Sequence, residues 1–191
     1  MEACRISKKE LLNEISGWNR FLKRKVHLIV CGGTALTILD LKESTKDIDF
    51  IVPNIDEYTY LIDTLKKLGY KSASGNGWIR DGKYVFDLFR GKFVHTTELL
   101  ESPLLEDKNI FFEEFTNVYL GILNFYDLII SKLFRGAQVD FDDCIILYKG
   151  KKSQINIDKL KERFEETASY DVNPNRLMIN LEVFLQMIEK E

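Results

Sequence analysis

The feature that most constrains the fold is the pattern of residues 26–52, in which two short apolar runs flank a pair of glycines. The first run, VHLIV, is rich in β-branched residues and predicts a buried strand. Gly32 and Gly33 interrupt this run, and a short helix is expected after them. The second run, DIDFIV, alternates acidic and apolar residues at its start, with Asp47 and Asp49 two positions apart. This order of elements predicts a layered fold that combines a sheet with helices.

Other segments are assigned by hydrophobic period and by capping residues. The motif Ser7-Lys-Lys-Glu10 is typical of a capping box, and Asp81-Gly82 indicates a tight hairpin. Between residues 92 and 121 the pattern is weaker and suggests a short helix and one or two strands. The patterns predict helices over residues 7–22, 34–41, 54–68, 125–134, 141–148, 157–168 and 174–188, and strands over 26–30, 47–52, 70–73, 78–80 and 84–89.

The spacing of apolar residues becomes that of a helix near Asn124 and remains so to the end of the sequence. Two regions are therefore expected, an α/β core over residues 1–122 and a helical region over residues 123–191. The predicted fold class is α+β (α/β): a mixed β-sheet flanked by helices, with a C-terminal helical bundle.

Composition narrows the possible functions. Three cysteines without a Cys-x-x-Cys unit, and only two histidines, argue against structural zinc and a disulfide framework, and suit a reducing compartment. No apolar run approaches the ~20 residues that a membrane span needs, so we expect a cytoplasmic protein with no membrane partner. A net charge of −3 argues against a protein that coats nucleic acid. The basic clusters at 20–25 and 149–152 favour a solvated surface, with a local polyanion site as the alternative.

The two acids of the second run are candidate metal ligands. Alternate residues of a strand point to the same face, so Asp47 and Asp49 lie side by side, about 7 Å apart along the strand. Such like charges repel unless a cation lies between them, and Mg²⁺ prefers oxygen ligands. Asp87, between large apolar residues, is a candidate third acid that can bind a second metal or accept a proton from an attacking hydroxyl.

The glycines supply a candidate phosphate site. Without a Cβ atom, the backbone amides of Gly32 and Gly33 can approach a phosphate closely, and the start of the next helix adds a partial positive charge. Thr34 can cap that helix or donate to a phosphate oxygen. A P-loop is excluded because no Lys-Ser or Lys-Thr follows the glycines at the required spacing.

Gly-Gly, a gap, Asp-x-Asp between apolar residues and a later acid together resemble the DNA polymerase β-like nucleotidyltransferase superfamily. The helical half, with the run YDLIISKLFR around Lys132 and acids at Asp140 and Asp143, is similar to AbiEii-type toxin and minimal nucleotidyltransferases. This resemblance implies that Lys132 contacts the phosphates of a nucleotide. From the residues themselves, Arg135 is expected to pair with Asp140 or Asp143, or these groups orient Lys132.

The implied activity is metal-dependent transfer of an NMP from an NTP to an acceptor hydroxyl. Two Mg²⁺ ions, or Mn²⁺, are expected, with Asp47, Asp49 and Asp87 as metal and catalytic residues and Gly32, Gly33, Thr34 and Lys132 as nucleotide-binding residues. The acceptor is left open between tRNA, a protein and a small molecule, and an antitoxin is a possible partner. The alternative is a catalytically silent nucleotide-binding or partner-binding module of the same fold.

Overall fold

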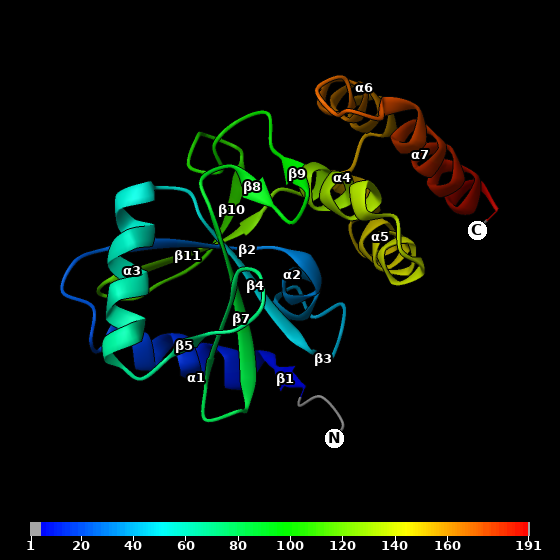
Figure 1. Ribbon diagram of the computed structural model, residues 1–191. Coiled ribbons are helices and arrows are strands. Elements are labelled where there is room, and N and C mark those ends of the chain that lie inside the picture. Colours follow the sequence, from blue (N-terminus) through cyan, green and yellow to red (C-terminus); the bar gives the residue numbers. More distant parts are fainter. Residues whose placement is uncertain (1–4, 191) are drawn as a thin grey trace. The chain divides into compact units, whose positions relative to one another are not determined.

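The computed structural model describes residues 5–190, and the chain folds into two compact units. Unit 1 comprises Met1–Phe93 and Glu101–Leu123, and unit 2 comprises Val94–Leu100 and Asn124–Glu191. Unit 1 contains the main sheet, and unit 2 is helical apart from a short strand (Figure 1). Residues 94–100 thus belong to the helical unit, although they precede in sequence the point near Asn124 where the hydrophobic period becomes helical.

The sheet of unit 1 is mixed and has seven strands. Its centre is formed by three strands, of which β2 and β4 run antiparallel while β4 and β7 run parallel. The strand order is β10 (Asn109–Glu114), β11 (Val118–Leu123), β2 (Val26–Val30), β4 (Asp47–Val52), β7 (Tyr84–Arg90), β6 (Gly77–Arg80) and β5 (Lys71–Ser72). Two further two-stranded pairs are β1 (Ile6–Ser7) with β3 (Ser44–Thr45) and β8 (Phe93–Val94) with β9 (Thr97–Glu98).

Helices α1 (Lys8–Asn19) and α3 (Ile55–Lys67) cover opposite faces of this sheet. On one face, Trp18 of α1 packs against Phe50 of β4 and Phe86 of β7, with ring centroids 6.1 and 4.7 Å apart. On the other face, Glu57 of α3 accepts a hydrogen bond from the backbone of His27 and lies 3.0 Å from its ring nitrogen. Alternation along the strands places Phe50 on the α1 side and Asp49 on the opposite side.

The short helix α2 (Gly32–Ile38) connects β2 to the following strands and is almost entirely buried. Its second glycine lies against Thr45 of β3, because a Cβ atom added at Gly33 would stand 3.0 Å from the Thr45 hydroxyl oxygen. This packing holds the start of α2 beside the beginning of β4.

Unit 2 is built from α4 (Phe125–Arg135), α5 (Gln138–Lys151), the short 3₁₀ helix η1 (Lys152–Gln154), α6 (Ile157–Ala168) and α7 (Pro174–Glu189). The core of this unit contains Phe164 of α6 and Phe184 of α7, which are both fully buried. Gly136 ends α4 in the left-handed conformation, with φ of 68°, as expected for a helix C-terminal residue.

The fold class predicted from the sequence is confirmed, and most of the elements are found within one to three residues of their expected positions. The Ser7–Glu10 capping box is present. Three details were wrong. The region 92–121 contains strands β8 to β11 and no helix, and α5 continues through Gly150 to Lys151 instead of ending before the glycine. α5 also begins earlier than its apolar period suggested, because Asp140 caps its first turn.

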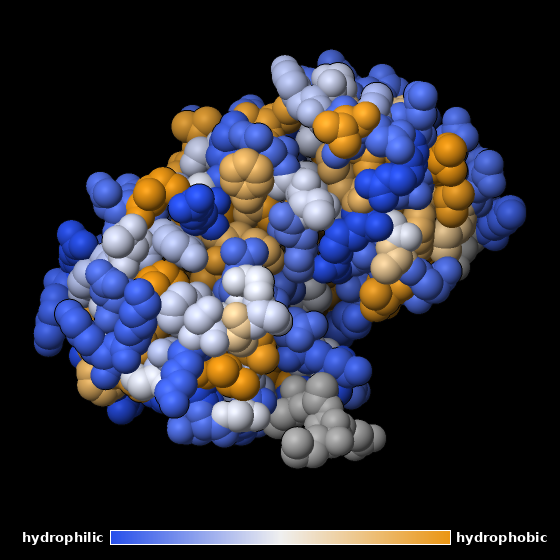
Figure 2. All heavy atoms as spheres, in the orientation of Figure 1, coloured by the Kyte–Doolittle hydropathy of each residue, from blue (hydrophilic) through white to orange (hydrophobic). Residues whose placement is uncertain are grey.

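Hydrophobic residues on the face shown in Figure 2 form separate groups among hydrophilic ones. None of the helices in residues 5–190 is both long enough and apolar enough to cross a lipid bilayer.

Candidate active site

Three carboxylates share one face of the sheet at the β4–β7 pair. Asp49 is the direct register partner of Asp87, and Asp47 is the partner of Val85. Neighbouring strands lie about 4.8 Å apart and alternate residues share a face, so all three acids project to the same side. Their environments differ: Asp47 is exposed, Asp87 is half-buried and Asp49 is only 5% exposed. The structure therefore brings together the three acids that the sequence singled out.

Gly32 lies directly against the Asp49 carboxylate. Its φ is +58°, and a Cβ atom added there would stand 2.1 Å from Oδ2 of Asp49. Both the left-handed backbone and the close approach require glycine at this position. The backbone of Gly32 and the carboxylate of Asp49 are therefore in direct contact. A ligand held by Asp49 would lie close to this backbone.

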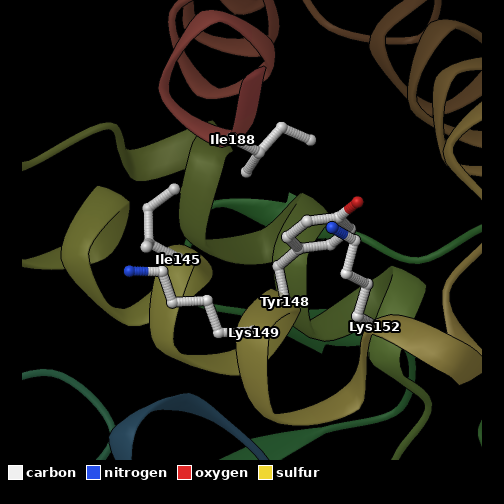
Figure 3. A pocket seen from close by; sticks show the side chains of 5 residues that line it. All are labelled: Ile145, Tyr148, Lys149, Lys152 and Ile188. Carbon is white, nitrogen blue, oxygen red and sulfur yellow. The ribbon is translucent and has the colours of Figure 1, made fainter. Parts of the chain in front are cut away.

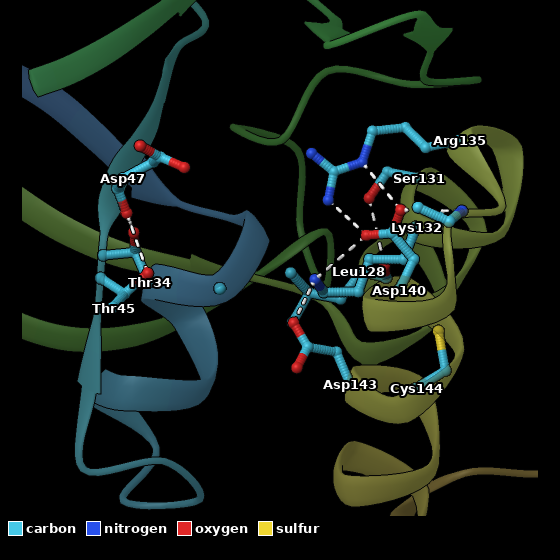
Figure 4. A network of polar contacts seen from close by, with 12 residues as sticks. Thr34, Thr45, Asp47, Leu128, Ser131, Lys132, Arg135, Asp140, Asp143 and Cys144 are labelled. Atoms are coloured by element: carbon cyan, nitrogen blue, oxygen red, sulfur yellow. Dashed lines mark hydrogen bonds and ion pairs between the residues drawn. The ribbon is translucent and has the colours of Figure 1, made fainter. Parts of the chain in front are cut away.

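Thr34 orients the strand that carries the acids. Its buried hydroxyl accepts a hydrogen bond from the Asp49 amide at 2.9 Å and donates one to the Asp47 carbonyl at 3.0 Å. The Thr45 hydroxyl donates to the same carbonyl at 3.0 Å (Figure 4). Because the single proton of the Thr34 hydroxyl is already donated to the backbone, its geometry supports a positioning role. The direct phosphate contact expected from the sequence would require this bond to break.

The electrostatics of Asp87 favour a cation nearby. Burial raises the pKa of Asp87, and the negative charge of Asp47 raises it further. A carboxyl with a raised pKa is a better proton acceptor when it is ionised, and its negative charge is stabilised when a cation binds nearby.

A metal site is not fully assembled from these side chains. Within residues 5–190, no three His, Cys, Asp or Glu side chains are close enough together to hold one ion. The donor set nevertheless fits a hard divalent cation, because it consists of carboxylate oxygens on a single face with Gly32 packed beside them. Ligation by all three acids would require their side chains to turn toward a common point.

Lys132 lies within a buried ion cluster of unit 2. Its side chain is 2% exposed, and its ammonium group is 2.7 Å from Asp143 and 3.7 Å from Asp140 (Figure 4). Both of its anionic partners come from α5. A contact with nucleotide phosphates, as the resemblance implies, would require at least one of these ion pairs to open.

Arg135 and His95 complete the cluster. Arg135 forms ion pairs with Asp140, and its Nη1 lies 2.9 Å from Nε2 of His95. Since the guanidinium can only donate, Nε2 of His95 accepts and the imidazole is neutral. Burial lowers the pKa of His95 to about 4, and the Arg135 charge contributes to this shift. No sequence pattern indicates this contact, because residues 94–100 bring His95 to a helix that follows about 30 residues later in the chain.

The fold is similar to ANT(2″)-Ia in complex with adenylyl-2″-tobramycin, with a TM-score of 0.56, 16% identity, and coverage of 83% of this chain and 95% of that chain. Weaker similarity, with TM-scores of 0.43 and 0.47, links the chain to candidate nucleotidyltransferases from Thermotoga maritima and H. pylori. Identity is 15% for both, with coverage of 85% and 97% of this chain and 100% and 98% of theirs.

The family model matches only the C-terminal part of the chain. Residues 106–191 match a family model described as "Nucleotidyltransferase of unknown function (DUF6036)". This segment contains the Lys132 cluster and lies after all three acids of the sheet. A search among curated proteins gave no match. The chain thus has a fold similar to that of ANT(2″)-Ia, and its C-terminal part matches a nucleotidyltransferase family model; both findings are consistent with the resemblance to the DNA polymerase β-like nucleotidyltransferase superfamily.

Proposed function

We propose that this protein is a metal-dependent nucleotidyltransferase that moves an NMP group from an NTP to an acceptor hydroxyl. The observation that carries the proposal is the in-register pair of Asp49 and Asp87, with Asp47 on the same face and Gly32 against the Asp49 carboxylate. On a nucleotidyltransferase fold, this arrangement supplies oxygen ligands and a close backbone approach at one place.

Each group has a proposed role. Asp47, Asp49 and Asp87 would hold Mg²⁺, which when bound neutralises charge on the phosphates and on the attacking and leaving oxygens. The backbone amides of Gly32 and Gly33 would contact the triphosphate, since the first amides of a helix have no intrahelical acceptor. Thr34 would position the strand. Lys132 would contact the phosphates once its ion pairs with Asp140 and Asp143 open.

In the reaction, an acceptor hydroxyl attacks the α-phosphorus of the NTP. A new oxygen–phosphorus bond forms, the bond from the α-phosphorus to the bridging oxygen breaks, and pyrophosphate leaves. The hydroxyl proton passes to a carboxylate oxygen of the ionised Asp87.

The acceptor is proposed only as a class: a hydroxyl on a small molecule, tRNA or a protein. The name of the ANT(2″)-Ia complex describes an adenylyl group on tobramycin, which supports including aminoglycosides among the compounds to test. A toxin paired with an antitoxin in the cytoplasm remains part of the proposal and rests only on the resemblance to AbiEii-type proteins.

The first experiment tests the site. Mg²⁺ together with one of the four NTPs is expected to raise the melting temperature of the wild type, and the Asp47→Asn/Asp49→Asn variant is expected to lose most of this shift. A variant with two exposed acids changed, Asp63→Asn/Asp142→Asn, removes the same charge and should keep the shift. Equal metal-dependent shifts in all three proteins would refute the site assignment.

The second experiment tests the reaction. An α-labelled NTP is incubated with the protein, Mg²⁺, and separate RNA, protein and small-molecule fractions of a cell extract that include aminoglycosides. We expect label to appear in one fraction, and Asp87→Asn to reduce the transfer by about 10²-fold or more, the scale of losing a general base. Binding of NTP without transfer to any fraction would support the silent binding module instead.

A further inference from the structure

The start of β4, which carries the acids, is held by side chains as well as by strand pairing. The ladder between β2 and β4 pairs residues 50 and 51 of β4, which follow both acids. At the acids themselves, the Cys31 amide donates to the Asp49 carbonyl at 3.1 Å, and threonine hydroxyls bond to the backbone of Asp49 and Asp47. The position of Asp47 therefore depends on which side chains reach its peptide.

Thr45 of β3 makes one of these contacts from a buried position. It is 8% exposed, and its hydroxyl donates to the Asp47 carbonyl at 3.0 Å (Figure 4). The same hydroxyl oxygen borders Gly33, since a Cβ atom added to that glycine would stand 3.0 Å from it. Thr45 therefore contacts both a proposed metal ligand and a residue proposed to bind the triphosphate.

Thr45 is itself held by the pairing of β3 with β1. Its register partner in this antiparallel pair is Ile6, which is fully buried. Beside it, the Arg5 guanidinium donates from Nε to the Ser44 hydroxyl at 2.8 Å and from Nη2 to the Ser44 carbonyl at 2.6 Å. Two donors on one planar group restrict the direction of β3 more than a single donor would. A continuous series of contacts thus runs from Arg5 through Ser44 and Thr45 to Asp47.

Asp47 gains more from such support than the other acid of β4. It is exposed and is the first residue of the strand, whereas Asp49 is buried and packs against Gly32. Because ligation by all three acids requires their side chains to turn toward a common point, any freedom of the Asp47 peptide adds to the entropy that is lost when a cation binds. A peptide that is already fixed before the cation arrives avoids part of this loss, which favours binding.

We propose that Thr45 is a positioning residue for Asp47 and that Arg5 acts through it, so that the β1–β3 pair forms part of the metal site. This inference rests on the proposed function, because it takes Asp47 as a ligand of a divalent cation. Neither Thr45 nor Arg5 is a ligand in this assignment; both raise the affinity for the cation by fixing the Asp47 peptide. A role confined to stability would instead lower the melting temperature and leave the affinity for the cation unchanged.

The test measures binding of Mn²⁺ to the full chain without nucleotide, from the loss of the electron paramagnetic resonance signal of free Mn²⁺. This ion takes the same oxygen ligands as Mg²⁺. The Asp47→Asn/Asp49→Asn variant shows how much Mn²⁺ binds elsewhere on the protein. Thr45→Val keeps the shape of the side chain and removes the donor, and is expected to weaken binding about three- to tenfold, the scale of one hydrogen bond. Thr45→Ser keeps the hydroxyl and should restore the affinity to within about twofold of the wild type.

Matched variants separate positioning from the loss of any hydroxyl or any charge. Thr64→Val removes a hydroxyl that donates to a backbone carbonyl of α3 at 2.9 Å, and should not weaken Mn²⁺ binding. Arg5→Gln removes the paired donors to Ser44 and should weaken binding about threefold, within the range for one hydrogen bond. Its control, Lys152→Gln, removes the same charge from an exposed lysine of unit 2 that lies beside the Tyr148 ring (Figure 3), and should bind like the wild type.

Thermal melts establish that each variant is folded, and if Thr45→Val does not fold, Arg5→Gln decides alone. The inference is overturned if the folded variants bind Mn²⁺ like the wild type, whatever their melting temperatures, or if Thr64→Val weakens binding as much as Thr45→Val. In both cases the proposed function stands as long as Asp47→Asn/Asp49→Asn has lost the binding. Wild-type binding no stronger than that of Asp47→Asn/Asp49→Asn would instead refute the metal site, and with it both the proposed function and this inference.

Discussion

Asp49 of β4 and Asp87 of β7 are direct register partners in a parallel strand pair, and Asp49 is also the residue against which Gly32 packs. Three segments that are distant in the sequence thus meet at one carboxylate. Because a shift of register by one residue would turn Asp87 to the opposite face of the sheet, the strand pairing itself controls whether the acids can act together.

Gly32→Ala is expected to abolish most NTP- and Mg²⁺-dependent stabilisation and to lower the free energy of unfolding by about 2–4 kcal/mol. About 1–2 kcal/mol of this comes from the left-handed backbone, and the remainder from the displaced Asp49 carboxylate. Urea denaturation and thermal melts with and without Mg²⁺ and NTP measure the two effects.

Gly75→Ala is the matched control for this prediction. Gly75 has a φ of +61°, and a Cβ atom added there would meet nothing within 4 Å. It therefore has the same backbone strain without the contact with Asp49. Equal losses in the two variants would show that the Gly32–Asp49 contact has no effect of its own.

Thr34→Val is expected to destabilise the protein by about 1–3 kcal/mol, because it leaves the buried Asp49 amide without its hydroxyl acceptor. Thr34→Ser keeps the hydroxyl and should restore most of the loss. Hydrogen exchange of the Asp49 amide provides the specific readout: protection should fall in the valine variant and return with serine. Unchanged protection in the valine variant would contradict the positioning role.

The local parts of the fold could be predicted from the sequence. The β4 strand was predictable because Ile48 and Phe50 alternate with the acids, and the start of α7 because Asn173 caps a helix with Pro174 in its first turn. The range 141–148 predicted for α5 was too short, because the helix continues through Gly150 to Lys151.

The tertiary contacts of the site were less predictable. Placing Asp87 beside Asp49 needed only the assumption that two strands are neighbours, and the structure supports it. The role of Thr34 depends on which backbone groups its hydroxyl reaches, and the burial of Lys132 depends on how α5 packs against α4. Neither is encoded in a short sequence pattern, because both arise from contacts between separate elements.

The Lys132–Asp143 pair is expected to show strong energetic coupling. Lys132→Met leaves two buried acids with Arg135 as the remaining cation of the cluster, and should cost about 3–5 kcal/mol of unfolding free energy. The double variant Lys132→Met/Asp143→Leu restores charge balance and should cost less than this single variant. A double-mutant cycle by urea denaturation measures the coupling, which should exceed about 1 kcal/mol.

An exposed pair provides the comparison for this cycle. Lys8 and Asp40 form an ion pair of 2.6 Å, but the Asp40 side chain is 73% exposed. A cycle with Lys8→Ala and Asp40→Asn should therefore give a coupling of only about 0–1 kcal/mol. If the buried pair coupled no more strongly than this exposed pair, the cluster would not be an energetic unit.

His95 should make stability depend on pH in a defined window. Its pKa falls from the ordinary value of 6.5 to about 4 on folding, chiefly because of burial and then because of Arg135, while Asp140 opposes the shift. Between these values the unfolded chain binds more protons than the folded chain, so the free energy of unfolding is highest above pH 6.5 and decreases as the pH falls toward 4. Allowing for the partial exposure of His95, the loss is expected to be about 1–2 kcal/mol.

The variant His95→Asn isolates this contribution. Asparagine tolerates the positive φ of 50° at this position and does not titrate in the window. Urea denaturation at several pH values between 4 and 7 should give a shallower decrease for the variant than for the wild type, while titrations of the carboxylates common to both proteins cancel in the difference. Parallel curves would mean that His95 has the same pKa in the folded and unfolded chains, and would contradict a neutral imidazole accepting a hydrogen bond from Arg135.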